Sequence, residues 1–187
     1  MRGEQEVLEL ILNTAREDER IRAVILSGSR ANPRAQRDFF RDFYVAYFVT
    51  DVAAFTNDPA WIDRFGEIMI LQTPEAMGNP PPASDGRFAY LMQFTDGNRI
   101  DLTLLPVAKV REFKRESLSL LLLDKDGVFE PFPAPDESDF LPKPPDAKAF
   151  SDCCNEFWWV CPYVAKGLWR EEIIYAKYML ERVVREQ

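Results

Sequence analysis

The order of apolar and polar residues near the N-terminus predicts a helix followed by a buried strand. Apolar residues recur at helical spacing between residues 4 and 20, and the charged residues of this segment fall on the opposite face. Residues 21–26 (IRAVIL) are apolar except for Arg22 and rich in β-branched side chains, which is typical of a strand inside a sheet. The chain therefore begins with an amphipathic helix that can cover a sheet.

Further apolar segments predict the rest of that sheet. Residues 88–94 and 99–105 flank the turn sequence TDGN, and two apolar segments around Asp-Gly indicate a β-hairpin. Strands are also expected at residues 42–49, 68–71 and 118–123.

Shorter elements are expected between these strands. Residues 60–65 and 107–116 predict short helices. Pro33 can begin another helix, because its ring presets a helical φ angle. Residues 79–82 (NPPP) predict a loop, since proline interrupts regular pairing.

The C-terminal part of the chain differs in character from the rest. Residues 131–145 are dense in proline and acidic residues and predict an extended connector. From Asp146 onward, long helices with many aromatic residues are expected, so we predict two parts, residues 1–145 and residues 146–187. Four aromatic residues of the second part are expected mainly in helix packing, with stacking against a ligand ring as the alternative: Trp158, Trp159, Tyr163 and Trp169.

Composition narrows the possible functions. The 187 residues are 47% hydrophobic, enough for one full domain with a small helical addition. A net charge of −8 and a pI of about 4.7 argue against nonspecific binding to nucleic acid, which requires a basic surface. The same acidity suits a polycationic small molecule, although many acidic proteins have no such ligand.

Rare and absent residue types exclude several kinds of site. The chain has no histidine, so it contains no histidine general base, no histidine metal ligand and no Ser-His-Asp triad. Cys153, Cys154 and Cys161 lack zinc-finger spacing. Their odd number, without a signal peptide, favours a reducing cytoplasm. The apolar runs, such as residues 118–123, are too short to cross a membrane.

A turn of small residues and two carboxylates mark the candidate chemistry. Ser27-Gly28-Ser29 ends the first expected strand, and the N–H groups of such a turn can hold a phosphate. Asp42 opens the second strand, and Asp101 stands alone among apolar neighbours in a later one. If these strands pair, Asp101 lies near Asp42. Because Mg²⁺ prefers carboxylate ligands, the pattern predicts a site for a nucleoside triphosphate with Mg²⁺.

Longer blocks of sequence carry a resemblance to a known family. The blocks are residues 28–33 (GSRANP), 85–102 (DGRFAYLMQFTDGNRIDL), 156–160 (EFWWV), 163–170 (YVAKGLWR) and 175–178 (YAKY). In this order they resemble the aminoglycoside 6-adenylyltransferases, a group within the polymerase-β-type nucleotidyltransferase superfamily. The likeness covers nearly the whole chain. It implies an α/β (α+β) nucleotidyltransferase fold, in which a mixed sheet is flanked by helices and followed by a helical C-terminal part.

The resemblance also implies a reaction. AMP would pass from ATP to a hydroxyl of the aminoglycoside streptomycin, with Mg²⁺ and release of pyrophosphate, which gives antibiotic resistance. Asp42 and Asp101 would bind the metal ion. Arg87 and Arg99, which flank the hairpin, are expected to pair with nearby acidic residues.

Five further residues receive roles from the same resemblance. Gly28 and Ser29 would bind the triphosphate, and Arg30 and Lys166 would be further phosphate contacts. Glu156 would act as the base that takes the proton of the acceptor hydroxyl. Arg30, Lys166 and Glu156 can equally be solvated surface residues, and Ser29 can be an ordinary turn residue.

The chain departs from the family pattern at one strand position. Relatives carry an aspartate two residues after the first strand acid, and this chain has Tyr44 there. A phenol, with a pKa of about 10, is neutral at pH 7 and a poor Mg²⁺ ligand, so weaker ATP·Mg binding and strongly reduced turnover are expected. One alternative is that Asp38 supplies the missing carboxylate. Another is that Asp42 only caps or solvates the end of a strand and binds no metal ion.

Two other functions stay open. A protein with this fold could bind nucleotide, or a partner, with little or no catalysis; Tyr44 and the end of the chain at Gln187, where family members continue into further helices, favour this alternative. Other members of the superfamily adenylylate lincosamides, proteins or RNA ends, and the acidity of this chain argues against RNA.

Overall fold

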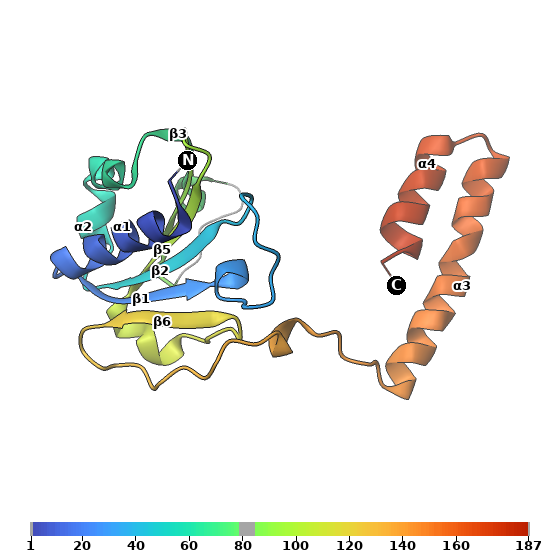
Figure 1. The fold of residues 1–187 in the computed structure, drawn as a ribbon. Coiled ribbons are helices and arrows are strands. Elements are labelled where there is room, and N and C mark those ends of the chain that lie inside the picture. Colours follow the sequence, from blue (N-terminus) through green and yellow to red (C-terminus); the bar gives the residue numbers. More distant parts are fainter. Residues whose placement is uncertain (1, 79–84, 187) are drawn as a thin grey trace. The chain divides into compact units, whose positions relative to one another are not determined.

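The computed structural model describes residues 2–78 and 85–186. It contains two compact units, Met1–Phe140 and Leu141–Gln187 (Figure 1). The loop predicted at residues 79–82 lies outside the described residues. Among the described residues, no helix has the length and apolar character needed to cross a lipid bilayer.

The first unit is built on a six-stranded mixed sheet with the strand order β3-β4-β5-β2-β1-β6. β2 and β5 run parallel, and the other neighbouring strands are antiparallel. The parallel pair therefore lies in the middle of the sheet. The strands are β1 (Ile21–Ser27), β2 (Phe43–Val49), β3 (Ile68–Gln72), β4 (Phe88–Phe94), β5 (Arg99–Pro106) and β6 (Ser119–Asp124).

These strands confirm the six predicted from the sequence, with slightly shifted ends. The β4–β5 hairpin is also confirmed, because the two strands pair antiparallel around the Asp-Gly turn. Gly97 has a φ of 87° in this turn, a left-handed conformation that glycine adopts without steric cost. The amide of Phe94 donates to the carbonyl oxygen of Asn98 at 2.9 Å and closes the turn.

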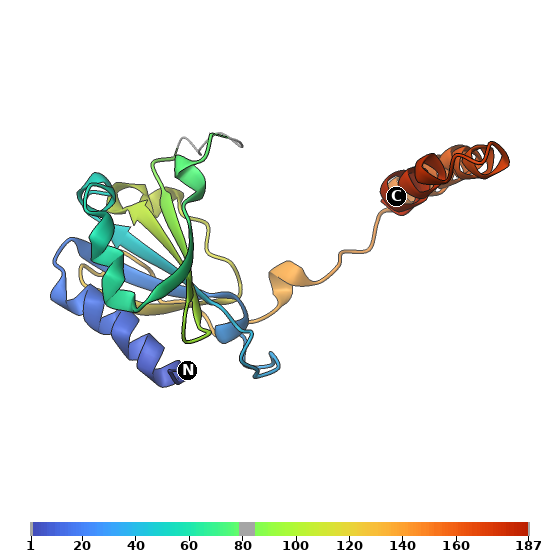
Figure 2. The same cartoon turned by 90° about the horizontal axis from the view of Figure 1, so that it is seen from above.

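One face of the sheet carries the main hydrophobic core. Helix α1 (Glu4–Glu17) lies across this face (Figure 2) and buries Val7 and Ile11 against it. The hydroxyl of Tyr47 donates to the carbonyl oxygen of Ile11 at 2.6 Å. Helix α2 (Ala53–Thr56) and the 3₁₀ helix η2 (Pro59–Phe65) complete the layer. The helix predicted for residues 4–20 is confirmed, although it ends at Glu17.

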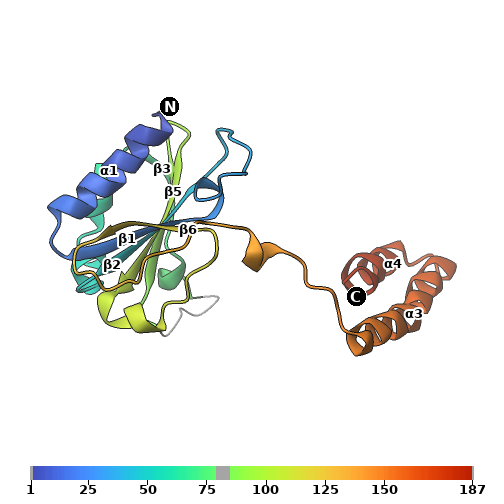
Figure 3. The ribbon, with the colours of Figure 1, turned by 60° about the horizontal axis from the view of Figure 1, so that its bottom comes forward.

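The opposite face of the sheet is covered less completely. Ala23, Ile25 and Phe48 form a smaller cluster there, and Phe113 and Phe129 pack edge-on against Phe48. The 3₁₀ helix η4 (Val107–Glu112) lies on this side, with α1 on the other side (Figure 3). The helix predicted for residues 107–116 is therefore wrong beyond Glu112. The backbone turns extended at Phe113, where the ring enters the smaller cluster.

The helix expected around Pro33 is also wrong. A single 3₁₀ turn, η1 (Gly28–Arg30), follows β1, and Pro33 lies in a turn after it. The side chain of Asn32 accepts a hydrogen bond from the amide of Arg34 at 2.8 Å and donates to Glu137 at 2.8 Å. An asparagine that bonds to the backbone two residues later favours a turn and competes with helix formation.

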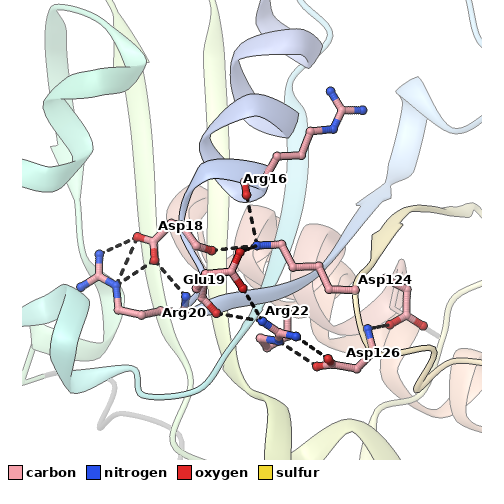
Figure 4. A network of polar contacts seen from close by, with 8 residues as sticks. Arg16, Asp18, Glu19, Arg20, Arg22, Asp124 and Asp126 are labelled. Atoms are coloured by element: carbon pink, nitrogen blue, oxygen red, sulfur yellow. Dashed lines mark hydrogen bonds and ion pairs between the residues drawn. The ribbon is translucent and has the colours of Figure 1, made fainter.

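A polar network joins the end of α1, the start of β1 and the turn after β6 (Figure 4). The guanidinium of Arg20 donates to both carboxylate oxygens of Asp18, at 2.9 and 2.5 Å. Arg22 forms an ion pair with Asp126, and the ammonium of Lys125 donates to the carbonyl oxygen of Asp18 at 3.1 Å. Segments about a hundred residues apart in sequence are thus tied together at one end of the sheet.

The second unit consists of helices. Helix α3 (Ala147–Trp169) begins at Asp146, whose carboxylate accepts a hydrogen bond from the amide of Ala149 at 2.7 Å. Helix α4 (Ile173–Tyr178) and the π-helical turn η6 (Met179–Val184) pack back against α3. The boundary predicted at Pro145 lies in the extended segment between Phe140 and α3.

Three tryptophans of α3 stay largely exposed within this unit, contrary to the expected helix packing, although the ring of Trp158 lies edge-on to that of Phe157, 5.2 Å between centroids. Trp158, Trp159 and Trp169 are 71%, 69% and 89% exposed. The face of α3 toward η6 instead carries Phe157 and Val164.

Candidate functional site

The parallel pairing of β2 and β5 brings the two candidate acids together. Tyr44 lies beside Asp101 in the strand register, and Asp42 immediately precedes β2. The Nε atom of Arg99 lies 2.8 Å from Oδ1 of Asp101 and 3.6 Å from Oδ2 of Asp42. One guanidinium therefore bridges both carboxylates. The predicted convergence of Asp42 and Asp101 is confirmed, as is the expected pairing of Arg99 with nearby acids.

The two acids belong to the less covered face of the sheet. Because alternate residues of a strand share a face, Tyr44 and Ala46 of β2 lie on this side together with Asp101 and Thr103 of β5. Their neighbours in sequence pack in the main core. A cavity of about 510 Å³ opens over these residues. Other side chains and backbone around it come from Ser27, Gly28, Leu91, Lys114, Glu116 and Ser119.

The Gly-Ser turn forms one wall of this cavity. Gly28 has a φ of 77°, and a Cβ atom there would lie 3.0 Å from Cδ2 of Tyr44. Only glycine meets both conditions without strain. The amide of Gly28 donates to the carbonyl oxygen of Leu118 at 2.9 Å, so this N–H is used inside the fold. The hydroxyls of Ser27 and Ser119 lie 2.9 Å apart at the same wall.

Ser29 and Arg30 follow in the turn but do not line the cavity. The side chain of Arg30 is 6% exposed; its Nη1 atom lies 3.2 Å from Glu4, and its Nη2 atom donates to the carbonyl oxygen of Arg41 at 2.5 Å. The guanidinium stacks 3.6 Å from the ring centroid of Phe43, a residue of the main core. Burial lowers the pKa of Arg30, against the opposing effect of Glu4. Arg30 thus ties the turn to α1.

Electrostatics at the acid pair follow from burial and from the shared charges. Burial raises the pKa of Asp42; the positive charge of Arg99 opposes this shift, and the negative charge of Asp101 adds to it. Burial raises the pKa of Tyr44 as well, and so do the charges of Asp42 and Asp101. The phenol is therefore neutral at pH 7, and Tyr44 adds no negative charge to the site.

The donor set fits one cation. The guanidinium held by Asp42 and Asp101 demonstrates that both carboxylates can reach a single positive group. The described residues contain no group of three acidic or cysteine side chains arranged for a metal ion. The alternative acid Asp38 is exposed and accepts a hydrogen bond from the amide of Phe40. Neither Asp38 nor Asp42 lines the cavity itself, but Asp42 shares the guanidinium of Arg99 with Asp101. One divalent ion would thus find two carboxylates here, beside the neutral oxygen of Tyr44.

Glu156 and Lys166 belong to α3 of the second unit, where both are exposed. The ammonium of Lys166 lies 5.3 Å from the ring centroid of Tyr163, a cation–π contact within the helix. Their roles as base and phosphate contact stay predictions.

Two residues that sequence reasoning missed line the cavity from the segment between η4 and β6. Lys114 is the only basic side chain among the described residues that line it, and Glu116 lies beside it. Both also line an adjoining hollow of about 550 Å³. The sequence pattern placed them in a helix and carried no signal for a site. Only the extended course of the chain after Glu112 brings them to the cavity that Asp101 lines.

A mixed sheet with a Gly-Ser turn after β1 and carboxylates converging from β2 and β5 defines a nucleotidyltransferase fold. A family profile described as Streptomycin adenylyltransferase matches residues 1–187. The chain belongs to this family.

Curated relatives agree with this membership. The chain is 47% identical to an aminoglycoside 6-adenylyltransferase from Campylobacter jejuni, covering 100% of this chain and 65% of that protein. It is 42% identical to the protein of the same name from Bacillus subtilis (strain 168), covering 99% and 66%. The chain thus spans about two thirds of the length of these relatives. The crystal structure of an aminoglycoside 6-adenyltransferase from Bacillus subtilis matches with a TM-score of 0.58 and 38% identity, covering 99% of this chain and 64% of that one.

Proposed function

We propose that the protein is an aminoglycoside adenylyltransferase, which transfers AMP from ATP to a hydroxyl of an aminoglycoside, with streptomycin as the expected acceptor. The observation that carries the proposal is the pairing of Asp42 and Asp101 beside the Gly28 turn. Family membership and the names of the relatives support it. The reaction would take place in the cytoplasm, where ATP is available, and would confer antibiotic resistance.

The acid pair has the central role in this proposal. Asp42 and Asp101 would hold Mg²⁺, which supplies charge neutralisation to the phosphates and to the leaving pyrophosphate. The triphosphate would lie in the cavity beside Gly28, with Ser29 next in the turn as the proposed phosphate contact, and Lys114 would offer a positive charge from the lining of the cavity. Arg30 would position the turn through its contacts with α1.

The acceptor is expected to be cationic. The chain carries a net charge of −8, and Glu116 adds a carboxylate to the cavity. An acidic surface attracts a polycation at long range and orients it at short range. Glu156 is proposed as the base for the acceptor hydroxyl, and Lys166 as a further phosphate contact, both from α3.

Pyrophosphate release from ATP·Mg tests the proposal. The acceptors would be streptomycin, two other aminoglycosides and a lincosamide. We expect release that depends on streptomycin and disappears in Asp101→Asn, because the charge that holds the metal ion is lost. Release that is independent of every acceptor, or that persists in Asp101→Asn, would overturn the proposal.

A second function, nucleotide binding with little transfer, is favoured by one observation. Tyr44 occupies the strand position beside Asp101 and is neutral. Isothermal titration of ATP·Mg beside the pyrophosphate assay separates the two functions. Binding without release would support a binding protein, and release at each turnover would support the transferase.

A further inference from the structure

The guanidinium of Arg99 is held by the two carboxylates of the acid pair. Among the described residues, the hydrogen bonds and ion pairs of its guanidinium go only to Asp101 and Asp42. Nε and Nη2 donate to the two oxygens of Asp101 at 2.8 and 2.9 Å, a bidentate geometry that is among the stronger ion pairs. The charge of Arg99 thus occupies the space between the two carboxylates.

Burial makes this cation important for Asp101. The side chain of Asp101 is 10% exposed, and Arg99 supplies its hydrogen bonds. A buried carboxylate without a partner is costly, so Asp101 needs a positive group. The two carboxylates therefore attract either the guanidinium or another cation, and the two cannot occupy the same oxygens together.

We propose that Arg99 is a resident cation that closes the Asp42–Asp101 pair, so that a divalent ion binds there only after the guanidinium has moved away. The inference rests on the proposed function in one respect only: that function identifies the ligand bound together with the divalent ion as a nucleoside triphosphate. Arg99 is thus a positioning residue. It sets the affinity of the acid pair for metal ions.

The side chain of Arg99 is free to make this movement. It is 40% exposed and lies at the first residue of β5, so its guanidinium can turn toward solvent without disturbing the strand. Arg30, by contrast, is pinned against Phe43 with 6% exposure. The phosphates of a nucleotide would offer the released guanidinium a new anionic partner.

Binding of Mn²⁺ without nucleotide, measured by electron paramagnetic resonance at neutral pH, tests the inference. We expect Arg99→Gln to bind Mn²⁺ about tenfold more tightly than the wild type, because a competing charge-assisted hydrogen-bond pair is removed while partial exposure screens its effect. Mn²⁺ should also raise the melting temperature of Arg99→Gln more than that of the wild type.

Arg87 provides a matched control. It pairs with Asp85 at 2.9 Å, is similarly exposed, and lines the adjoining hollow but not the cavity at the acid pair. Arg87→Gln removes the same charge, and its Mn²⁺ affinity should change by less than about twofold. In the double variant Arg99→Gln/Asp101→Asn the gain in Mn²⁺ affinity should disappear. This result would show that the gain arises at the acid pair.

The outcomes separate this inference from the proposed function. An unchanged or weaker Mn²⁺ affinity in Arg99→Gln, or an equal gain in Arg87→Gln, would overturn the inference whatever the enzymatic activity. A non-hydrolysable ATP analogue should reduce the difference between wild type and Arg99→Gln. If the Mn²⁺ gain is present but no acceptor yields pyrophosphate, the inference holds and the proposed transferase function fails.

Discussion

At the scale of single residues, Tyr44 decides how much negative charge the site carries. Its ring lies against Gly28, and its hydroxyl is neutral at pH 7 because the pKa of a phenol is about 10; partial burial and two neighbouring carboxylates raise this pKa further. An aspartate in its place would point to the same face as Asp42 and Asp101. The acid pair would then become a cluster of three carboxylates.

Tyr44→Asp should raise the rate of AMP transfer. We expect an increase on the order of a hundredfold in kcat, the scale on which one group that stabilises transition-state charge acts. Steady-state pyrophosphate release measures it. Tyr44→Asn is the control, because asparagine has the size of aspartate without its charge. The kcat of this variant should stay near that of the wild type. Equal turnover in the wild type and Tyr44→Asp would disprove the idea that the phenol limits activity.

Lys114→Gln should weaken ATP binding. Lys114 is the basic side chain that lines the cavity, so its loss should raise the KM for ATP about tenfold and leave kcat less affected. Lys109→Gln is the matched control, because Lys109 pairs with Glu112 at 3.0 Å and lines only the adjoining hollow. An equal effect in both variants would remove Lys114 from the site.

At the scale of elements, one residue in each unit holds neighbouring elements together through close contacts: Arg2 in the first unit and Gly167 in the second. The guanidinium of Arg2 donates to Asp96 at 2.6 Å and to the carbonyl oxygen of Phe65 at 2.5 Å, which ties the residues before α1 to the β4–β5 hairpin and to η2. In the second unit, Gly167 of α3 lies directly against Ala176 of α4.

The Asp96 contact should make stability depend on acid pH. Although burial acts to raise the pKa of Asp96, hydrogen bonds from Arg2 and Asn98 lower it well below its usual range. A carboxyl with a lowered pKa in the folded state stabilises above its unfolded pKa of about 3.9, and this stabilisation is lost as the pH falls through the folded value.

Asp96→Asn therefore should cost about 1–2 kcal/mol of unfolding free energy at neutral pH. The difference from the wild type should shrink steadily below about pH 4. Urea unfolding at several pH values measures this. Asp85→Asn, at an exposed ion pair, should show little difference at any pH. A gap of constant size down to low pH would contradict the role of the Asp96 charge.

Gly167→Ala should destabilise the packing of α3 on α4. The added Cβ would lie 2.9 Å from both the Cβ of Ala176 and Cδ1 of Tyr175, so the helices must move apart at a cost of about 1–3 kcal/mol. In an open helix the same change would stabilise by about 1 kcal/mol. Hydrogen exchange of the amides in α3 and α4 should become faster. Gly78→Ala, where a Cβ would meet no atom of the described residues within 4 Å, is the control. Slower exchange in Gly167→Ala would refute the contact.

At the scale of the whole molecule, the net charge of −8 produces a negative potential around the protein, and salt screens this potential. Such a potential would favour the polycationic acceptor that we propose. The division into two units leaves the paired acids, the turn and the cavity within the first unit.

The KM for streptomycin should therefore rise with ionic strength. Raising NaCl from about 0.01 M to 0.15 M shortens the Debye length from about 30 to 8 Å, and we expect a several-fold increase. Steady-state kinetics at fixed ATP measures it. The KM for ATP, whose magnesium complex is an anion, should not rise in parallel. A parallel rise of both KM values would point to a general effect of salt on the protein.

Local pattern by itself determined the strands and the hairpin, because strand periodicity and turn chemistry act over a few residues. It placed Asp42 and Asp101 at strands, and the parallel pairing of β2 with β5 then brought the two acids together. The family blocks added the fold. Only the tertiary structure decided that Arg30 turns toward α1, that Lys114 reaches the cavity, that Trp158 stays exposed within its unit, and that Arg99 closes the acid pair. Each of these side-chain placements depends on a segment that is distant in sequence and packs against the residue. Residue spacing and composition describe only the local chain, so they do not show which distant segment that is.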